Sequence, residues 1–253
     1  MKLNYKVLGE GSPVVILHGL FGMLDNWITF GRALSANYKV FLVDQRNHGN
    51  SPHSEAHSYT LMAEDLLAFC EEHQLQKITL IGHSMGAKTA MRFALDNPER
   101  VANLIVIDMG VQQYTGGHET IFRALRTLDL ESVSSRKEAE FALTELIPEP
   151  GVRQFLLKNL HRTEDNTYEW KFNLEALYQH YAETLSGITA SEPYYGKVTC
   201  IRGGNSGYVQ DADWDAFTAI FPNAQLFTVP DAGHWVHADQ PEALLTLVEK
   251  IIA

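Results

Sequence analysis

The residues Gly82-His83-Ser84-Met85-Gly86 follow a short apolar run at 77–81 and precede a helical pattern at 87–95. A serine between two glycines, at the point where a strand turns into a helix, is typical of a nucleophile elbow. In such a turn the serine hydroxyl stands at the tip, and the glycines let the strand and helix backbones come close together. The sequence therefore predicts that Ser84 sits at a sharp turn as a candidate nucleophile.

Outward from this turn, apolar runs alternate with helical patterns. Most of the runs are continuous, which is typical of parallel strands covered on both faces. Only Leu3, Tyr5 and Val7 alternate with polar residues, which indicates a half-buried antiparallel strand. We therefore predict an α/β fold with a mostly parallel central sheet flanked by helices. The continuous runs lie at 14–17, 39–44, 77–81, 101–108, 198–203 and 225–229.

Residues 112–190 break this alternation, because their pattern is helical almost throughout, apart from one short possible strand at 168–170. A single crossover between strands requires less helix than this, so we predict a helical cap inserted over the ends of the strands. The predicted division is a core of residues 1–111 and 191–253 and a cap of residues 112–190. The candidate cap helices are 119–130, 134–147, 152–160 and 174–185.

The composition limits the partners and the setting. At 253 residues the chain suits one large domain or a core with an inserted cap. The net charge of −11 argues against nucleic acid as a partner. No apolar run reaches the length of a membrane span, and we see no signal peptide. Cys70 and Cys200 are the only cysteines, so we expect a cytoplasmic protein without disulfides. Monomer and homodimer both stay open.

A serine hydroxyl is a weak nucleophile and needs an adjacent base. With this kind of elbow the partners follow in the order serine, acid, histidine. His234, in the loop at 231–235 after the last strand, has the expected place, and His237 is a weaker candidate. No pair of histidines has metal-ligand spacing backed by further ligands, so we predict no metal. Five other histidines are expected to be solvated: His53, His57, His73, His161 and His180.

The position of the acid is less obvious. Its usual place is the loop after the first strand that follows the cap, but residues 203–208 contain no carboxylate. Asn205 in that loop cannot stabilise an imidazolium by charge. Asp108 ends the preceding strand and projects from the same edge of the sheet, one strand nearer Ser84. We therefore assign Asp108 as the acid, with Asp211 as the fallback. The competing interpretation is that Asp108 only caps backbone amides.

Hydrolysis also requires hydrogen-bond donors for an oxyanion. The backbone N–H of Met85, directly after the nucleophile, is one candidate, and the loop at 18–22 supplies the other. We choose the amide of Leu20, with that of Phe21 next. Phe21 and Trp235 are expected to contact the substrate, together with a few apolar cap residues. The polar cluster after the strand at 39–44 is expected to brace the surrounding loops: Asp44, Arg46, Asn47 and His48.

Four segments together resemble the α/β-hydrolase superfamily: 15–19 (VILHG), 44–49 (DQRNHG), 82–86 (GHSMG) and 233–237 (GHWVH). More narrowly they are similar to the bacterial YbfF-type esterases and, more distantly, to the ABHD-type hydrolases. The resemblance spans nearly the whole chain. It implies the α/β-hydrolase fold, a serine–aspartate–histidine triad with the acid after the sixth strand, and hydrolysis of short-to-medium acyl esters. Acyl-CoA thioesters are a further option. The sequence departs from the commoner superfamily pattern in the loop that contains Asn205.

We therefore predict a serine hydrolase of small-molecule carboxylic esters that works through an acyl-enzyme and needs no cofactor. One alternative is a C–C bond hydrolase or an elimination catalyst that uses the same three residues on another substrate. The other is a non-enzymatic ligand-binding protein that retains the triad. Four basic cap residues could meet a CoA phosphate, although a solvated helix face is the simpler interpretation: Arg123, Arg126, Lys158 and Arg162.

Overall fold

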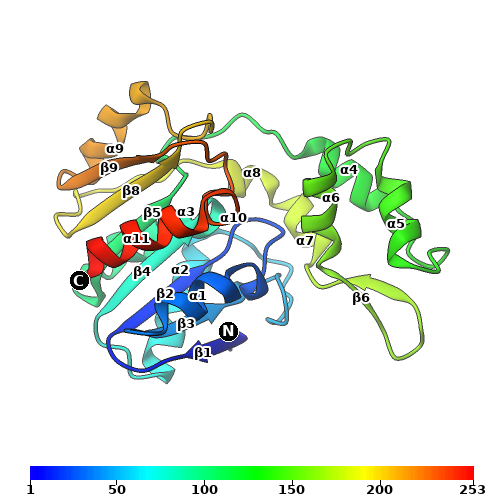
Figure 1. The fold of residues 1–253 in the computed structure, drawn as a ribbon, viewed down its shortest axis with the longest axis horizontal. Coiled ribbons are helices and arrows are strands. Elements are labelled where there is room, and N and C mark those ends of the chain that lie inside the picture. Colours follow the sequence, from blue (N-terminus) through cyan, green and yellow to red (C-terminus); the bar gives the residue numbers. More distant parts are fainter.

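The computed structural model describes residues 1–253 and is built around one seven-stranded sheet (Figure 1). The strand order across the sheet is β1-β3-β2-β4-β5-β8-β9. Only β1 runs antiparallel to its neighbour, so the predicted mostly parallel sheet is confirmed. The strands are β1 (Tyr5–Leu8), β2 (Pro13–Leu17), β3 (Lys39–Val43), β4 (Ile78–His83), β5 (Val101–Ile107), β8 (Val198–Gly203) and β9 (Ala224–Val229).

Alternate residues of the central strands face two separate apolar layers. Val15 of β2 packs in the layer that contains helices α2 and α3, whereas Val14 packs in the layer of α1 and α11. Because successive strand side chains point to opposite faces, helices cover the sheet on both sides. Figure 1 shows α1 and α11 side by side across one face. These helices are α1 (Ile28–Leu34), α2 (Tyr59–Glu72), α3 (Met85–Asp96) and α11 (Pro241–Ile252).

Some local expectations need correction. Helix α2 begins at Tyr59, and Ser58 is its N-cap, because the Ser58 hydroxyl accepts a hydrogen bond from the amide of Leu61 at 3.3 Å. His57, expected to be solvated, is buried. The segment around it folds back under the loops at the sheet edge, which a polar sequence does not reveal. Two elements were not predicted as helices: α9 (Trp214–Ile220) and the short α10 (Val236–Asp239).

Five helices and a small hairpin lie together at one end of the sheet (Figure 1), and we call residues 119–185 the helical group. The short strand expected at 168–170 is β7, and it pairs with β6, which was not expected. The predicted helix at 174–185 is interrupted at His180. The elements are α4 (Glu119–Thr127), α5 (Arg136–Leu143), α6 (Pro150–Leu157), β6 (Leu160–Arg162), β7 (Tyr168–Trp170), α7 (Leu174–Gln179) and α8 (Tyr181–Leu185).

Two connectors, residues 109–118 and 186–197, join the helical group to the sheet. They are hydrogen-bonded to each other, because the amide of Ile188 donates to the carbonyl of Val111 at 2.8 Å. The amide of Tyr114 donates to the carbonyl of Leu185, the last residue of α8, at 2.9 Å. Buried Lys88 of α3 ties both to the sheet: its ammonium donates to the carbonyls of Gln112, at 2.9 Å, and Ser186. The helical group is therefore anchored beside the helix that follows the elbow.

Two further features of the fold are the character of its helices and the state of its cysteines. None of the helices combines the length and the apolar character that crossing a bilayer requires. Cys70 and Cys200 are both buried and unpaired, so no disulfide contributes to this fold. Burial raises the pKa of both thiols to about 12, which keeps them protonated and unreactive at neutral pH.

Candidate active site

Ser84 lies between β4 and α3 in a strained backbone conformation, with φ 54° and ψ −120°. A positive φ is costly for a residue with a side chain, and such residues cluster at functional sites. The glycines on either side allow the turn to close. A Cβ atom on Gly82 would lie 2.3 Å from the carbonyl oxygen of Gly86, and one on Gly86 would lie 2.5 Å from that of Leu17. Both positions therefore require glycine.

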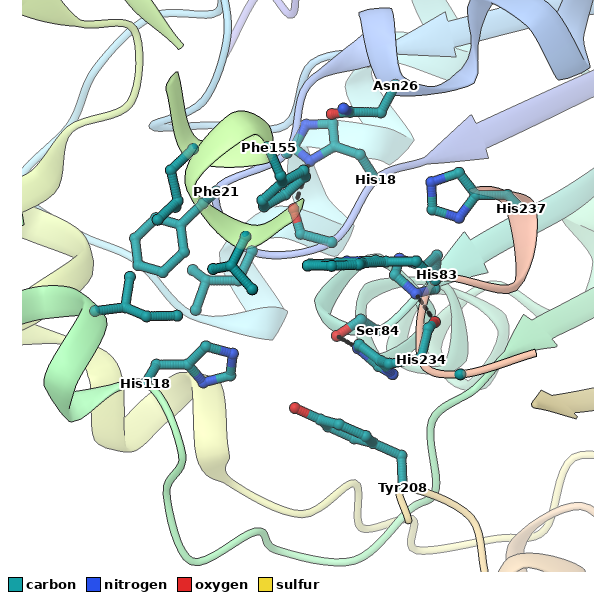
Figure 2. A pocket seen from close by; sticks show the side chains of 18 of the residues that line it. His18, Phe21, Asn26, His83, Ser84, His118, Phe155, Tyr208, His234 and His237 are labelled. Atoms are coloured by element: carbon teal, nitrogen blue, oxygen red, sulfur yellow. Dashed lines mark hydrogen bonds between the residues drawn. The ribbon is translucent and has the colours of Figure 1, made fainter. Parts of the chain in front are cut away.

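The three residues assigned to a triad come together at the carboxyl edge of the sheet, and Figure 2 shows two of them, Ser84 and His234, side by side. The Ser84 hydroxyl lies 3.0 Å from Nε2 of His234, and Nδ1 of His234 lies 2.7 Å from Oδ2 of Asp108. Ser84 follows β4, Asp108 follows β5, and His234 is in the loop after β9. Parallel strands bring their carboxyl ends to one edge, so residues far apart in the chain meet there.

Asp108 is fully buried, and its carboxylate accepts hydrogen bonds from two groups besides His234. The amide of Gly203 donates to Oδ1 at 3.0 Å, and the Ser206 hydroxyl donates to Oδ2. The fallback acid, Asp211, is 88% exposed and forms an ion pair with Arg202 at 2.7 Å. The structure therefore brings Asp108, and not Asp211, to the histidine.

Two neighbours that the sequence analysis did not identify hold His234 in place. The ring of Tyr208 stacks on the imidazole with centroids 3.8 Å apart and planes 17° apart. Nε2 of His83 lies 2.8 Å from the carbonyl oxygen of His234 and donates to it. His83 is a variable position of the elbow motif, and Tyr208 lies in the loop where the acid was sought. His237, the weaker candidate, stacks on Trp27 instead, with centroids 4.2 Å apart.

Two backbone amides beside Ser84 are free to bind an oxyanion. The N–H of Met85 opens α3 and has no intrahelical acceptor. The N–H of Leu20 donates to no acceptor in the protein, whereas that of Phe21 donates to Nε2 of His48 at 3.3 Å. The loop lies close to the serine, because a Cβ atom on Gly19 would be 3.1 Å from Cβ of Ser84. Of the two candidates in this loop, Leu20 is therefore the available donor.

A family model described as alpha/beta hydrolase fold matches residues 12–241. The chain belongs to the α/β-hydrolase family. It is 38% identical over 264 residues to the sn-1-specific diacylglycerol lipase ABHD11 of Mus musculus, covering 100% of this chain and 86% of that protein. It is 34% identical over 258 residues to esterase YbfF of Escherichia coli, covering 100% and 99%. The resemblance found in the sequence motifs is thus confirmed.

Two solved structures share this fold at different levels of sequence identity. A marine microorganism esterase has a TM-score of 0.97 to this α/β-hydrolase at 40% identity, and the match covers 99% of both chains. A meta-cleavage product hydrolase from Pseudomonas fluorescens IP01 has a TM-score of 0.66 at 20% identity, covering 99% of this chain and 93% of that one. At that identity the second match shows a shared fold and nothing finer.

Ser84 and His234 of this α/β-hydrolase line a cavity of about 370 Å³ between the sheet edge and the helical group. Phe21 and Trp235, the two residues predicted to contact the substrate, both line it, and Phe155 of α6 packs on Trp235 with ring centroids 5.3 Å apart. Other aromatic residues of the helical group are buried in its core instead, among them Phe122 and Phe172. The apolar lining consists of Leu20, Phe21, Trp27, Ile121, Val152, Phe155, Leu156 and Trp235, with the ring of Tyr208 beside them.

The polar cluster after β3 braces the loops of this α/β-hydrolase, as expected. Asp44 accepts hydrogen bonds from the amides of Leu24, at 2.7 Å, and Asn50, at 2.9 Å. The side chain of Arg46 donates to Asp65 at 2.6 Å. Nε2 of His48 accepts a hydrogen bond from the amide of Phe21, in the loop at 18–22, at 3.3 Å. These bonds hold that loop and the segment at 44–51 together, so that the amide of Leu20 keeps its position beside Ser84.

The histidines around the cavity are held neutral. Burial lowers the pKa of His237 to about 4, and the same cause lowers that of His118 to about 4. Burial also lowers the pKa of His83 well below its usual value, with His234 as a further cause. The imidazolium that His234 would form during catalysis therefore has no charged imidazole beside it. No group of three or more His, Cys, Asp or Glu side chains is arranged to hold a metal ion.

Proposed function

We propose that this chain is a serine carboxylic-ester hydrolase that cleaves small-molecule esters through an acyl-enzyme. The observation that carries the proposal is the continuous hydrogen-bonded relay from Ser84 through His234 to buried Asp108, open to an apolar cavity. Membership of the α/β-hydrolase family supports it, as do relatives named esterase and lipase. The relay supplies the adjacent base that a serine nucleophile needs.

In the first half of the reaction, Oγ of Ser84 attacks the ester carbonyl while Nε2 of His234 takes the hydroxyl proton. Asp108 keeps the second imidazole proton on Nδ1 and stabilises the imidazolium by its charge. The carbonyl oxygen becomes an oxyanion, which the amides of Met85 and Leu20 bind. His234 then gives its proton to the leaving alkoxide oxygen, so the alcohol departs neutral and the acyl group stays on Ser84.

In the second half, a water molecule takes the place of the alcohol. His234 removes one proton from the water, and the resulting hydroxide attacks the acyl carbonyl. The same two amides bind the second oxyanion. When the intermediate collapses, the proton on His234 returns to Oγ of Ser84 and the carboxylic acid is released. No electron transfer occurs, so this chemistry is balanced without a cofactor.

We further propose that residues 112–190 act as a cap that shapes the acyl site. Helix α6 contributes Phe155 and Leu156 to the cavity, opposite the elbow. A volume of about 370 Å³ is near the lower end of the range for small-molecule sites, about 300–1,000 Å³. A site of this size favours short-to-medium acyl chains over long ones.

Oxygen esters are the proposed substrates in preference to acyl-CoA thioesters. The triad would cleave a thioester by the same steps, but a CoA phosphate needs free positive charge nearby. Arg126 is already paired with Glu175 at 3.3 Å. Lys158 lies in a neighbouring cleft that also contains Asp239 and Glu242, so an anion there would meet two carboxylates.

The test is an acyl-length series of p-nitrophenyl esters and acyl-CoAs, run on the protein and on Ser84→Ala. We expect kcat/KM to be highest for short-to-medium esters and lower for every CoA thioester of equal length. Ser84→Ala should lower kcat roughly ten-thousandfold or more, because the base has no nucleophile to activate. A circular dichroism spectrum checks that the variant is folded.

Two further measurements separate the alternatives. A fluorophosphonate should label Ser84 in the parent and not in Ser84→Ala, whereas a ligand-binding protein with an idle serine would stay unlabelled. A panel of vinylogous diketones should be cleaved much more slowly than esters. Faster cleavage of the diketones would instead identify a C–C bond hydrolase.

A further inference from the structure

The cavity wall contains two polar groups that the proposed mechanism does not use. His118 ends one connector directly before α4, and Tyr208 lies in the loop after β8. Figure 2 shows the imidazole of His118 and the hydroxyl of Tyr208 directed into the same space, in front of Ser84. Neither Nε2 of His118 nor the Tyr208 hydroxyl has a hydrogen-bond partner in the protein, although both residues line the cavity. Unpaired polar atoms in a mainly apolar site point to recognition of a polar substrate group.

The protein holds His118 in one tautomer. The amide of His118 donates to the hydroxyl oxygen of Tyr181 at 3.0 Å, and that oxygen lies 2.9 Å from Nδ1 of His118. Nδ1 is the only acceptor within hydrogen-bond distance of the Tyr181 hydroxyl, so the hydrogen of that hydroxyl is directed at Nδ1. The ring proton is then on Nε2, which faces the cavity as a donor. Burial lowers the pKa of His118 to about 4, so this donor carries no charge at neutral pH.

Tyr208 is held just as firmly. Its ring stacks on His234, and its carbonyl oxygen accepts hydrogen bonds from the Tyr114 hydroxyl at 2.7 Å and from Nε2 of Gln112 at 3.3 Å. Burial raises the pKa of the Tyr208 hydroxyl, so the group remains protonated and can both donate and accept. These contacts fix the position of the Tyr208 hydroxyl before a ligand binds. Little side-chain entropy is therefore lost when the hydroxyl forms a hydrogen bond with a ligand.

The position of Tyr208 indicates which part of the ester it meets. The leaving oxygen must come within reach of Nε2 of His234, because that nitrogen gives it a proton. A ring stacked on the same imidazole therefore borders the alcohol portion of the ester. No lysine or arginine lines the cavity, so a carboxylate or phosphate on that portion would find no counter-charge. An uncharged oxygen on the alcohol portion can accept hydrogen bonds from His118 and Tyr208, which are both uncharged.

We propose that His118 and Tyr208 form a polar subsite that binds an uncharged oxygen, such as a second hydroxyl, on the alcohol portion of the ester. The inference rests on the proposed ester hydrolysis and deepens it by naming the substrate class: esters of hydroxylated alcohols rather than of plain alkanols. The subsite does not alter the chemical steps. An ester with a hydroxylated alcohol portion gains hydrogen bonds to the subsite. When the alcohol portion is a plain hydrocarbon, His118 and Tyr208 stay without a hydrogen-bond partner, so binding is weaker.

The test compares 2-hydroxyethyl butanoate with propyl butanoate, which differ by one hydroxyl in place of one methyl. Tyr208→Phe removes only the hydroxyl, and His118→Phe removes the imidazole donor but keeps an aromatic ring beside Phe21. Each variant should lower the ratio of kcat/KM for the hydroxylated ester to that for the propyl ester by about three- to tenfold, the worth of one hydrogen bond. Because all proteins use the same two esters, their intrinsic difference in reactivity cancels.

The matched control is Tyr178→Phe, which removes a tyrosine hydroxyl from the same helical group on the solvent-exposed side. It should leave both the ratio and the activity as in the parent. If both esters are cleaved and the ratio is the same in Tyr208→Phe, His118→Phe and the parent, the subsite is disproved while ester hydrolysis stands. If the parent cleaves neither ester nor any member of the p-nitrophenyl series, the proposed function fails and this proposal fails with it.

Discussion

At the scale of single residues, Asp108 shows how one side chain can serve the fold and the site together. Its Oδ1 accepts the amide of Gly203, and its Oδ2 accepts Nδ1–H of His234 and the Ser206 hydroxyl. The capping and the orienting interpretations of Asp108 are therefore compatible, because different oxygens satisfy them. The backbone of Asp108 also has a positive φ of 49°, which turns the chain out of β5 just where the carboxylate is needed.

Replacing this carboxylate should cost most of the activity. Asp108→Asn keeps the shape but presents an amide group to donors, so His234 loses the preferred tautomer and the charge that stabilises its imidazolium. We expect kcat for p-nitrophenyl butanoate to fall by about 10³–10⁴-fold, with little change in KM. Asp211→Asn is the matched control and should keep parental kinetics, because Asp211 is exposed and bound to Arg202. The opposite pattern, an inactive Asp211→Asn with an active Asp108→Asn, would reverse the assignment.

The sequence could identify some of these residues and not others, for physical reasons. Ser84 and His234 lie in local patterns, since a strand, a turn and the end of the last strand can be recognised from neighbours. Asp108 could be found by elimination, because the expected loop has no carboxylate. His118 and Tyr208 could not be found, because their importance lies in facing the same cavity from segments far apart in the chain.

At the scale of elements, α3 links the elbow to the connectors of the helical group. Ser84 precedes the helix, and Lys88 and Arg92 follow at intervals of four residues on the same face. Lys88 donates to both connectors, as described above, and Arg92 donates to the carbonyl of Thr189 at 3.0 Å. Burial lowers the pKa of Lys88 to about 8. The neutral amine still has two N–H donors, so both hydrogen bonds can persist above that pH.

Removing the buried tether should loosen the connectors. Lys88→Met keeps much of the volume but leaves the carbonyls of Gln112 and Ser186 without their donor in a site shielded from water. We expect the amides of Tyr114 and Ile188 to exchange hydrogen about tenfold faster, as one lost hydrogen bond implies. Arg92→Met is the control: Arg92 is partly exposed, so water can replace its hydrogen bond and exchange should change much less. Equal effects of the two variants would show that burial of Lys88 is not what holds the connectors.

The sequence predicted elements of the sheet better than those of the helical group. Continuous apolar runs predict parallel strands well, because such strands are buried on both faces. Of the β6–β7 hairpin only the strand at 168–170 was expected, because strands of three residues are too short to show clear periodicity. The break at His180 also left no sign, since the residues on both sides suit helices. Which helical side chains line the cavity depends on how the helices pack, so Ile121 and Val152 were missed.

At the scale of the whole molecule, burial keeps several histidines uncharged at once. Burial is the main cause that lowers the pKa of His57, His118 and His237 to about 4 each. It also lowers the pKa of His48 well below its usual value. These histidines come from the loops beside the sheet edge, from a connector and from α10. Acid therefore has to protonate several buried imidazoles around the site, and the folded state resists each of these protonations.

The direction of the resulting pH dependence follows from the sign of these shifts. An unfolded histidine has a pKa near 6.5, so between about pH 6.5 and 4 the unfolded chain binds more protons than the folded one. The contribution of these histidines to the free energy of unfolding is therefore complete above about pH 6.5, and it is lost as the pH falls from 6.5 toward 4. One buried histidine with a pKa of about 4 contributes about 2 kcal/mol to the loss between pH 8 and pH 5. Urea unfolding at several pH values measures this slope.

A cycle of pH and mutation isolates the part that belongs to His57. This side chain is buried, and Arg46 and His180 add to the lowering of its pKa, while the Asp65 carboxylate opposes it. His57→Gln cannot titrate, so its cost at pH 8 measures only packing and hydrogen bonding. At pH 5 that cost should shrink by about 2 kcal/mol, because only the parent must hold an imidazole neutral. A cost that is the same at both pH values would mean that His57 does not resist protonation in the folded chain, and the acid sensitivity would then have to come from the other buried histidines or from carboxylates.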